Sequence, residues 1–66
     1  MQLTVNGESR SFQGVADVAG LVAALGLDSK KVAVERNLEI VPRSAYSKTS
    51  LADGDRIEIV HFIGGG

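Results

Sequence analysis

The longest alternating apolar pattern in this chain is Arg56-Ile-Glu-Ile-Val-His-Phe-Ile63. A period of two is typical of a β-strand, because successive side chains of a strand point to opposite faces of the sheet. The two faces of the predicted strand carry Ile57, Ile59, His61 and Ile63 on one side and Glu58, Val60 and Phe62 on the other. Since Glu58 belongs in water, we predict that Val60 and Phe62 also face solvent and form a docking surface. In the alternative, Phe62 folds back into the core.

Three glycines follow this strand, Gly64-Gly65-Gly66. Three extended residues reach about 10 Å, and residues without a Cβ can pass through a narrow channel. We therefore expect residues 64–66 to form a flexible tail that brings the carboxylate of Gly66 into the active site of another protein. The simpler alternatives are a frayed end and a cloning remnant.

The N-terminal segment predicts a hairpin. Leu3 and Val5 alternate with polar residues, and Asn6-Gly7 supplies two residues that tolerate the positive φ angles of a two-residue turn. We expect a strand, a turn and a second strand that ends near Phe12.

One helix is predicted, over about residues 15–25. Its apolar positions follow the spacing i, i+3, i+4 and i+7, which places on one helical face Val18, Leu21, Val22 and Leu25. Gly14 is the expected N-cap, Asp17 falls in the first turn where a negative charge is favourable, and Gly26 has the place of a C-terminal cap. Gly20 costs about 1 kcal/mol relative to alanine, so we expect close packing against a neighbour to justify it.

Two further strands follow the helix. The alternating residues 32–35 predict one strand, a turn is expected at Asn37-Leu38, and Ile40-Val41 predicts a short returning strand. Pro42 lacks a backbone donor, which suits the end of an edge strand. Residues 43–50 are polar and predict a loop with a single helical turn.

Together these elements predict an α+β domain over residues 1–63, followed by the tail 64–66. One helix covers only one face of a sheet, so we expect a mixed sheet of four to five strands wrapped around it. The two most apolar strands lie at the ends of this domain, and pairing them in the middle of the sheet protects them from solvent.

Composition excludes several classes of protein. The chain has 66 residues and no cysteine, so we expect one domain without disulfides, thiolate–zinc sites or a cysteine nucleophile. The formal net charge is -1 with scattered basic residues, which argues against a nucleic-acid partner. The N-terminal residues lack the pattern of a signal peptide or a membrane span, so we expect a cytoplasmic protein that is monomeric when free.

The sequence holds no catalytic constellation. His61 is the only histidine, and no serine stands in a Gly-x-Ser-x-Gly motif. Asp53-Gly54-Asp55 lacks the remaining ligands of a calcium loop and predicts a turn. We therefore expect neither a bound metal nor a bound cofactor. The reactive group that remains is the carboxylate of Gly66, which becomes an electrophile once an activating enzyme converts it to an acyl-adenylate.

Four stretches carry a family likeness: Val32-Ala-Val-Glu-Arg-Asn37, Ile40-Val-Pro-Arg-Ser44, Leu51-Ala-Asp-Gly-Asp-Arg-Ile-Glu-Ile-Val60 and the terminal Gly65-Gly66. Through them, nearly the whole chain resembles the bacterial sulfur carriers of thiamine biosynthesis, a ubiquitin-like β-grasp family. Leu38 departs from the pattern, since a glycine suits a tight turn better.

The resemblance implies a mechanism as well as a fold. An ATP-dependent activating enzyme adenylates Gly66, a cysteine desulfurase or another persulfide donor supplies sulfur, and the resulting thiocarboxylate donates that sulfur to thiazole synthase. Gly64 and Gly65 would provide reach. Phe62 and Ile63 would contact the partners, and ATP would be consumed by the activating enzyme and not held by this chain.

Three other functions stay open at this stage. The small subunit of molybdopterin synthase is also a β-grasp sulfur carrier, although chain length and the segment Val41-Pro-Arg-Ser44 favour the thiamine pathway. A ubiquitin-like modifier would use its terminus to form an isopeptide bond with a lysine. A simple binding module would have an inert tail.

Overall fold

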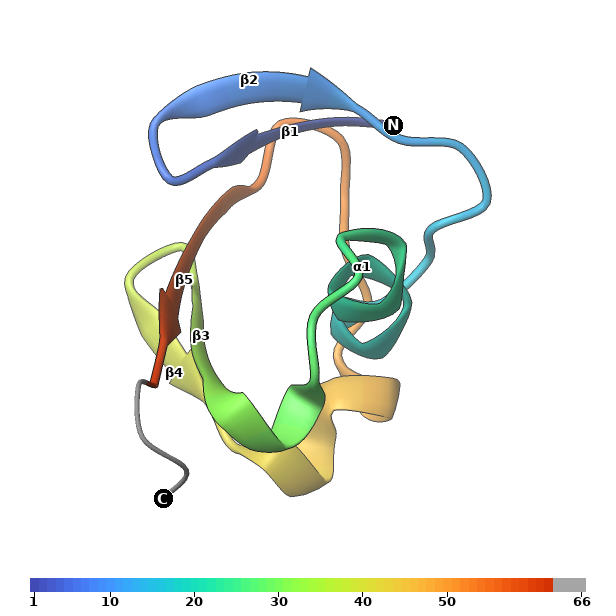
Figure 1. The fold of residues 1–66 in the computed structure, drawn as a ribbon. Coiled ribbons are helices and arrows are strands. Elements are labelled where there is room, and N and C mark those ends of the chain that lie inside the picture. The colour runs from blue at the N-terminus through green and yellow to red at the C-terminus, as the bar shows by residue number, and fades with distance from the viewer. Residues whose placement is uncertain (63–66) are drawn as a thin grey trace.

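A computed structural model describes residues 1–62 of the chain. A five-stranded mixed sheet, ordered β2-β1-β5-β3-β4, curves around one α-helix (Figure 1). The elements are β1 (Gln2–Val5), β2 (Glu8–Ser11), α1 (Val18–Ala24), the 3₁₀ helix η1 (Ser29–Lys31), β3 (Val32–Arg36), β4 (Glu39–Val41), the 3₁₀ helix η2 (Arg43–Lys48) and β5 (Arg56–His61). The predictions made for Ile63 and for the tail residues Gly64, Gly65 and Gly66 lie outside the described residues.

The last strand occupies the centre of the sheet. β5 runs parallel to β1, with Val5 opposite Ile57, and antiparallel to β3, with Val34 opposite Ile59. The prediction that the first and last strands pair in the middle is confirmed. Ile57 is fully buried there, and truncation of such a side chain to alanine costs about 2 to 5 kcal/mol.

Helix α1 covers the concave face of this sheet (Figure 1). Its buried residues meet inward-facing residues of the strands in one core cluster, formed by Leu3, Val5, Val18, Leu21, Val22, Val32, Val34, Val41, Tyr46, Leu51 and Ile57. The other face of the sheet has no covering element among residues 1–62, and we call it the open face. Strand alternation therefore divides the side chains into a buried set and a solvent-facing set.

The predicted start of the helix was wrong. Asp17 and not Gly14 is the N-cap: its backbone is extended, and its side chain accepts a hydrogen bond from the Gly20 N–H at 2.7 Å. The helix cannot begin at residue 15, because the backbone of residues 16–18 bonds to the distant segment 49–51 instead. The Val18 N–H donates to the carbonyl of Thr49, and Asp17 forms an isolated β-bridge with Ser50.

The C-terminal end of the helix follows the prediction. Gly26 adopts a φ of 71° just beyond the last helical residues. Its N–H donates to Ala23, and the Leu27 N–H donates to Val22 at 3.1 Å, which is the pairing of a Schellman cap.

The neighbour that justifies Gly20 is the helix cap itself. A Cβ at this position would lie 3.3 Å from Oδ1 of Asp17, which is tighter than ordinary van der Waals contact. Glycine thus leaves room for the carboxylate that caps the helix, at the expense of helix propensity.

Both predicted hairpin turns are confirmed. Asn6 and Gly7 have φ angles of 49° and 82°, and Asn37 and Leu38 have angles of 50° and 71°. These values suit the type I′ turn, whose twist matches that of the flanking strands. Pro42 follows the edge strand β4, as predicted, and residues 43–48 form the expected short helical segment.

Candidate functional site

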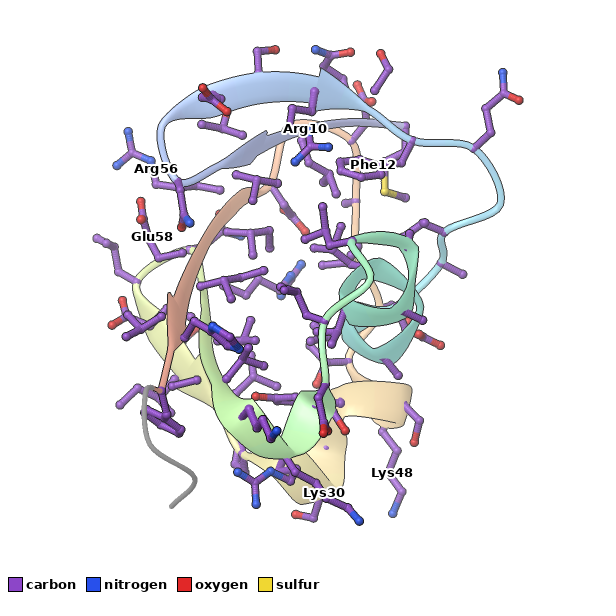
Figure 2. The ribbon with its side chains drawn as sticks, viewed as in Figure 1. Arg10, Phe12, Lys30, Lys48, Arg56 and Glu58 are labelled. Carbon is purple, nitrogen blue, oxygen red and sulfur yellow. The ribbon has the colours of Figure 1, made fainter. Side chains whose placement is uncertain are left out.

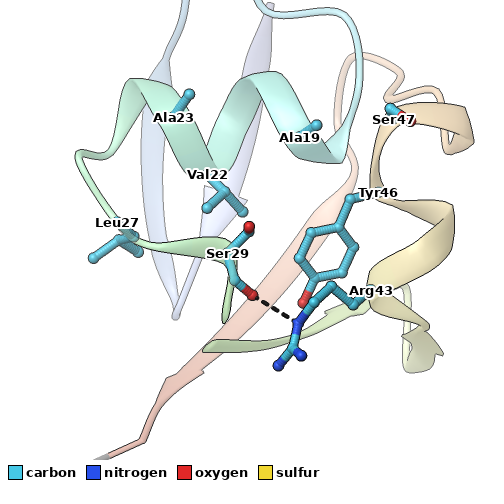
Figure 3. A pocket seen from close by; sticks show the side chains of 8 residues that line it. All are labelled: Ala19, Val22, Ala23, Leu27, Ser29, Arg43, Tyr46 and Ser47. Atoms are coloured by element: carbon cyan, nitrogen blue, oxygen red, sulfur yellow. Dashed lines mark hydrogen bonds between the residues drawn. The ribbon is translucent and has the colours of Figure 1, made fainter. Parts of the chain in front are cut away.

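A shallow pocket of about 250 Å³ lies between α1 and η2, and its two largest polar side chains, Arg43 and Tyr46, are already hydrogen-bonded (Figure 3). Nε of Arg43 donates to the Ser29 carbonyl at 3.0 Å. The hydroxyl of Tyr46 donates to the carbonyl of Val32 at 3.3 Å. The first bond joins η2 to η1 and the second joins η2 to β3, so both side chains have a structural role and the pocket carries no catalytic group.

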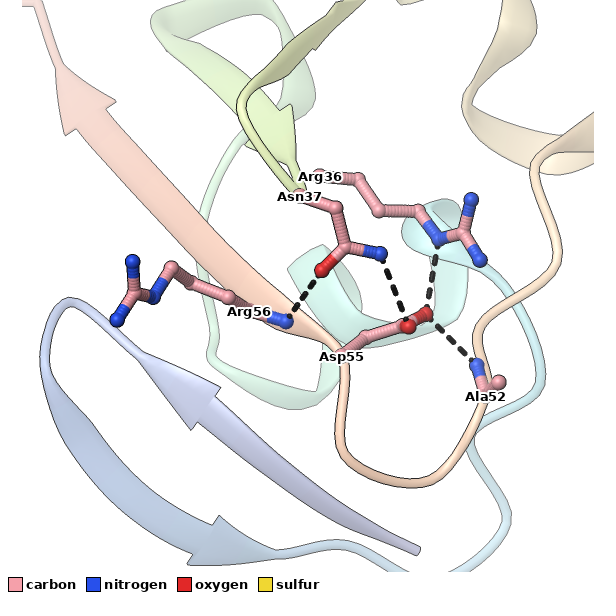
Figure 4. Close-up of polar contacts among 5 residues, drawn as sticks. All are labelled: Arg36, Asn37, Ala52, Asp55 and Arg56. Carbon is pink, nitrogen blue, oxygen red and sulfur yellow. Dashed lines mark hydrogen bonds and ion pairs between the residues drawn. The ribbon is translucent and has the colours of Figure 1, made fainter.

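Asp55 is the one buried charged residue among residues 1–62 (Figure 4). Its Oδ2 accepts from Arg36 Nε and from the Ala52 N–H, both at 2.8 Å, and its Oδ1 accepts from Asn37 Nδ2 at 3.1 Å. Burial opposes ionisation, but these hydrogen bonds and the charge of Arg36 outweigh it and lower the pKa of the carboxyl. The predicted turn at residues 53–55 is therefore a structural junction that fixes the start of β5.

His61 lies in β5 opposite Val32 and is exposed. The interpretation of this residue as part of a strand is confirmed. Its place beyond the buried part of β5 gives it no orienting group of the kind a catalytic base needs.

The open face carries the apolar groups that the strand phase predicts. Val60 is 61% exposed and Phe62 is 44% exposed, so Phe62 does not fold into the core. Sequence reasoning missed Ile40 of β4, which is 76% exposed. The signal was present, because Ile40 alternates with Val41, which is buried.

Two carboxylates border these apolar groups. Glu35 of β3 and Glu58 of β5 are opposite one another in the antiparallel register, and both are half-buried. Figure 2 shows Glu58 and Arg56 on the side of the sheet that points away from α1. We define the docking face as Ile40, Val60 and Phe62 with Glu35 and Glu58.

The carboxylates of the docking face form no salt bridge within residues 1–62, although Arg56 lies on the same side of the sheet. The salt bridge found among residues 1–62 joins Arg36 to Asp55, and Glu35 and Glu58 take no part in it. Like charges directly opposite one another destabilise an antiparallel pair. An apolar surface bordered by carboxylates that make no salt bridge fits a partner with apolar and basic side chains.

These features define a class of protein: a small β-grasp domain that leads from an exposed sheet face into a C-terminal glycine segment and holds no assembled catalytic centre among residues 1–62. Residues 3–66 match the ThiS family. The chain therefore belongs to the ThiS family of sulfur carriers.

Individual relatives agree with this assignment. The sulfur carrier protein ThiS of Bacillus subtilis is 42% identical over 65 residues, which cover 97% of this chain and 98% of that protein. The crystal structure of the thiamine biosynthesis protein (ThiS) from Geobacter metallireducens matches with a TM-score of 0.84 and 39% identity, and the whole of both chains is covered. The predicted β-grasp fold and the predicted family of sulfur carriers are confirmed.

Other relatives are much longer. The thiazole synthase of Paramagnetospirillum magneticum is 58% identical over 66 residues, and the thiazole synthase of Magnetococcus marinus is 44% identical over the same length. The chain spans 20% of the length of each of these proteins.

None of the helices in residues 1–62 has the length and apolar character needed to span a bilayer.

Proposed function

We propose that this chain carries sulfur as a thiocarboxylate on Gly66 and donates it to a thiazole synthase. The observation that carries the proposal is the family match, which runs through Gly66 itself. The thiazole synthases of two bacteria contain a segment similar to this whole chain. A carrier-like domain within the same protein as the synthase supports the view that the two act together.

The chemistry needs only the carboxylate and partner enzymes. A carboxylate oxygen of Gly66 attacks the α-phosphorus of ATP, and pyrophosphate leaves. The terminal sulfur of a persulfide then attacks the acyl carbon, and AMP leaves. A reducing thiol cleaves the sulfur–sulfur bond, which frees the thiocarboxylate for the synthase. ATP is bound by the activating enzyme, and this chain holds no cofactor of its own.

The docking face is the surface that the partner enzymes recognise, and it is followed in the sequence by the tail. Val60 and Phe62 immediately precede the segment formed by Ile63 and the three glycines. A partner that covers these side chains would remove apolar surface from water and would place a basic group near Glu35 and Glu58. We assign Val60, Phe62 and Ile63 to partner docking, Gly64 and Gly65 to reach, and Gly66 to the reactive terminus.

Intact-mass spectrometry tests the proposal directly. The chain is incubated with an activating enzyme, ATP and a persulfide source, and we expect one oxygen of the C-terminal carboxylate to be exchanged for sulfur. Deletion of Gly66 is expected to abolish this exchange while the circular dichroism spectrum stays unchanged. A full-length chain that keeps its original mass, or that becomes linked to other proteins, would contradict the proposal.

A second experiment separates the two sulfur-transfer pathways. The thiocarboxylated chain is offered in parallel to thiazole synthase and to the large subunit of molybdopterin synthase. We expect loss of sulfur with thiazole synthase and its substrates. Transfer to the molybdopterin enzyme alone would move the chain to that pathway.

A further inference from the structure

Strand β1 ends before its neighbour β5 does. The parallel register joins Thr4 to Arg56 and Val5 to Ile57. The Asn6 N–H then donates to the carbonyl of Ile57 at 2.9 Å, after which the chain turns away into the first hairpin. The C-terminal half of β5 therefore extends beyond the backbone of β1, and β3 pairs with it on the other side through residue 61.

The side chain of Asn6 takes over where the backbone of β1 stops. Its Oδ1 accepts a hydrogen bond from the Ile59 N–H at 2.7 Å, and its Nδ2 donates to the Ile59 carbonyl at 3.2 Å. One side-chain amide thus satisfies both backbone groups of Ile59, which in a longer β1 would bond to two different peptide groups. We call this pair of bonds the Asn6 clip.

Residue type and conformation fit this role. Asn6 has a φ of 49°, in the left-handed region that asparagine tolerates better than most residues. Its amide offers one acceptor and two donors. An ionised aspartate, by contrast, can only accept hydrogen bonds. The turn and the clip therefore both call for asparagine.

The clip lies just before the docking face. Ile59 precedes Val60, and Phe62 follows two residues later. We propose that Asn6 is a positioning residue for sulfur transfer: it holds the C-terminal half of β5 on its β1 side, so that Val60 and Phe62 of the docking face are presented to the activating enzyme in one fixed arrangement. This role rests on the proposed function of the chain as a sulfur carrier.

The chain contains a matched control at the other end of β5. Asn37 is the first residue of the second hairpin turn, with a φ of 50°. Its Oδ1 accepts from the Arg56 N–H at 2.9 Å, its N–H donates to the Arg56 carbonyl at 2.8 Å, and its Nδ2 donates to Asp55. The two asparagines make similar bonds to β5, but Asn6 holds Ile59, which is next to Val60, whereas Asn37 holds Arg56 at the start of the strand.

The test compares Asn6→Gly with Asn37→Gly. Glycine keeps the positive φ of each turn, so each variant loses its side-chain bonds, and the added entropy of the unfolded chain is the same in both. For Asn6→Gly we expect a roughly tenfold higher KM of the activating enzyme for the carrier, which is about 1.4 kcal/mol, with kcat unchanged and faster amide exchange at Ile59. Asn37→Gly is expected to lower the melting temperature at least as much and to leave KM unchanged. Asn6→Asp is expected to behave like Asn6→Gly.

Two results would overturn the inference. The first is a wild-type KM for Asn6→Gly despite faster exchange at Ile59. The second is a rise in KM for Asn37→Gly that matches the rise for Asn6→Gly, because the effect would then follow stability alone. If the wild-type chain gains no sulfur in the same assay, both the proposed function and the role of Asn6 are wrong. If the wild type and Asn6→Gly are equally reactive, only the role of Asn6 is wrong.

Discussion

Glu35 lies directly opposite Glu58 on the open face of the sheet. Two carboxylates in this arrangement repel each other, and the fold gains nothing from them. Their presence beside Val60 is understandable if a partner supplies a positive charge between them.

Removal of one charge should therefore separate stability from binding. For Glu58→Gln we expect the free energy of unfolding to rise by about 0.2 to 0.5 kcal/mol and the association with the activating enzyme to slow, most clearly at low salt. Chemical denaturation and stopped-flow binding at two salt concentrations measure the two effects. Glu8→Gln on the exposed edge strand β2 is the control and should change neither. A destabilised Glu58→Gln would mean that the repulsion is already compensated.

The apolar part of the docking face gives the second prediction. Val60→Asp places a charge on a side chain that is 61% exposed, so we expect little change in the melting temperature. Binding to the activating enzyme or to thiazole synthase should weaken by at least about tenfold, as expected for an interface anchor. Phe62→Asp should behave alike. The control is Ser47→Asp, which adds the same charge on the exposed part of η2, away from the docking face, and should bind normally. An equal loss of affinity in all three variants would point to a general effect of charge.

Leu38 carries backbone strain that the fold does not need. It combines a φ of 71° with a side chain that is 74% exposed. Leu38→Gly should raise the free energy of unfolding by about 1 kcal/mol, because a left-handed conformation costs an ordinary residue roughly 1 to 2 kcal/mol. Gly7→Ala is the reverse experiment at the matching turn, where an added Cβ meets no atom within 4 Å, and it should cost a similar amount. Thermal and denaturant unfolding measure both, and a stability loss for Leu38→Gly would show that the leucine side chain contributes to packing.

Asp55 makes the domain sensitive to acid. Its pKa in the folded state lies below the ordinary value of 3.8, so the unfolded chain binds the proton first as the pH falls. The stabilisation is fully present above that value and is lost as the pH drops from there through the lower folded pKa. Asp55→Asn should be less stable at neutral pH and should lose part of this pH dependence, whereas Glu8→Gln should retain it. Melting temperatures between neutral pH and strong acid test the point.

Gly20 and Asp17 should be energetically coupled. An alanine at position 20 gains about 1 kcal/mol of helix propensity, but its Cβ would crowd the capping carboxylate at 3.3 Å. We expect Gly20→Ala to gain less than that in the wild-type chain and the full amount in an Asp17→Ala background. A double-mutant cycle of unfolding free energies measures the difference, and strictly additive effects would show that the cap relaxes without cost.

Local patterns were enough to predict most of this fold. The alternation from residue 56 onward fixes which side chains of β5 face solvent, and the spacing of Val18, Leu21 and Val22 fixes the buried side of the helix. Asn6-Gly7 predicts its turn from the φ preferences of two residues. Each of these features depends on residues close together in the chain, so the sequence contains the necessary information directly.

What escaped prediction depends on contacts between distant segments. The helix begins late because Val18 bonds to Thr49, and no local signal reveals that partner. The bonds of Asn6 to Ile59 require knowledge of which strand lies beside the turn. The opposition of Glu35 and Glu58 requires the register between β3 and β5.

The central place of β5 also governs when the domain can form during synthesis. The hairpin of β1 and β2 and the hairpin of β3 and β4 are both made before β5, yet in the sheet each is joined to the other only through it. A nascent chain that stops before residue 56 has two hairpins and no strand between them. The complete sheet and its docking face therefore require β5, the segment that leads into the glycines, so a chain that lacks its last strand cannot form the docking face.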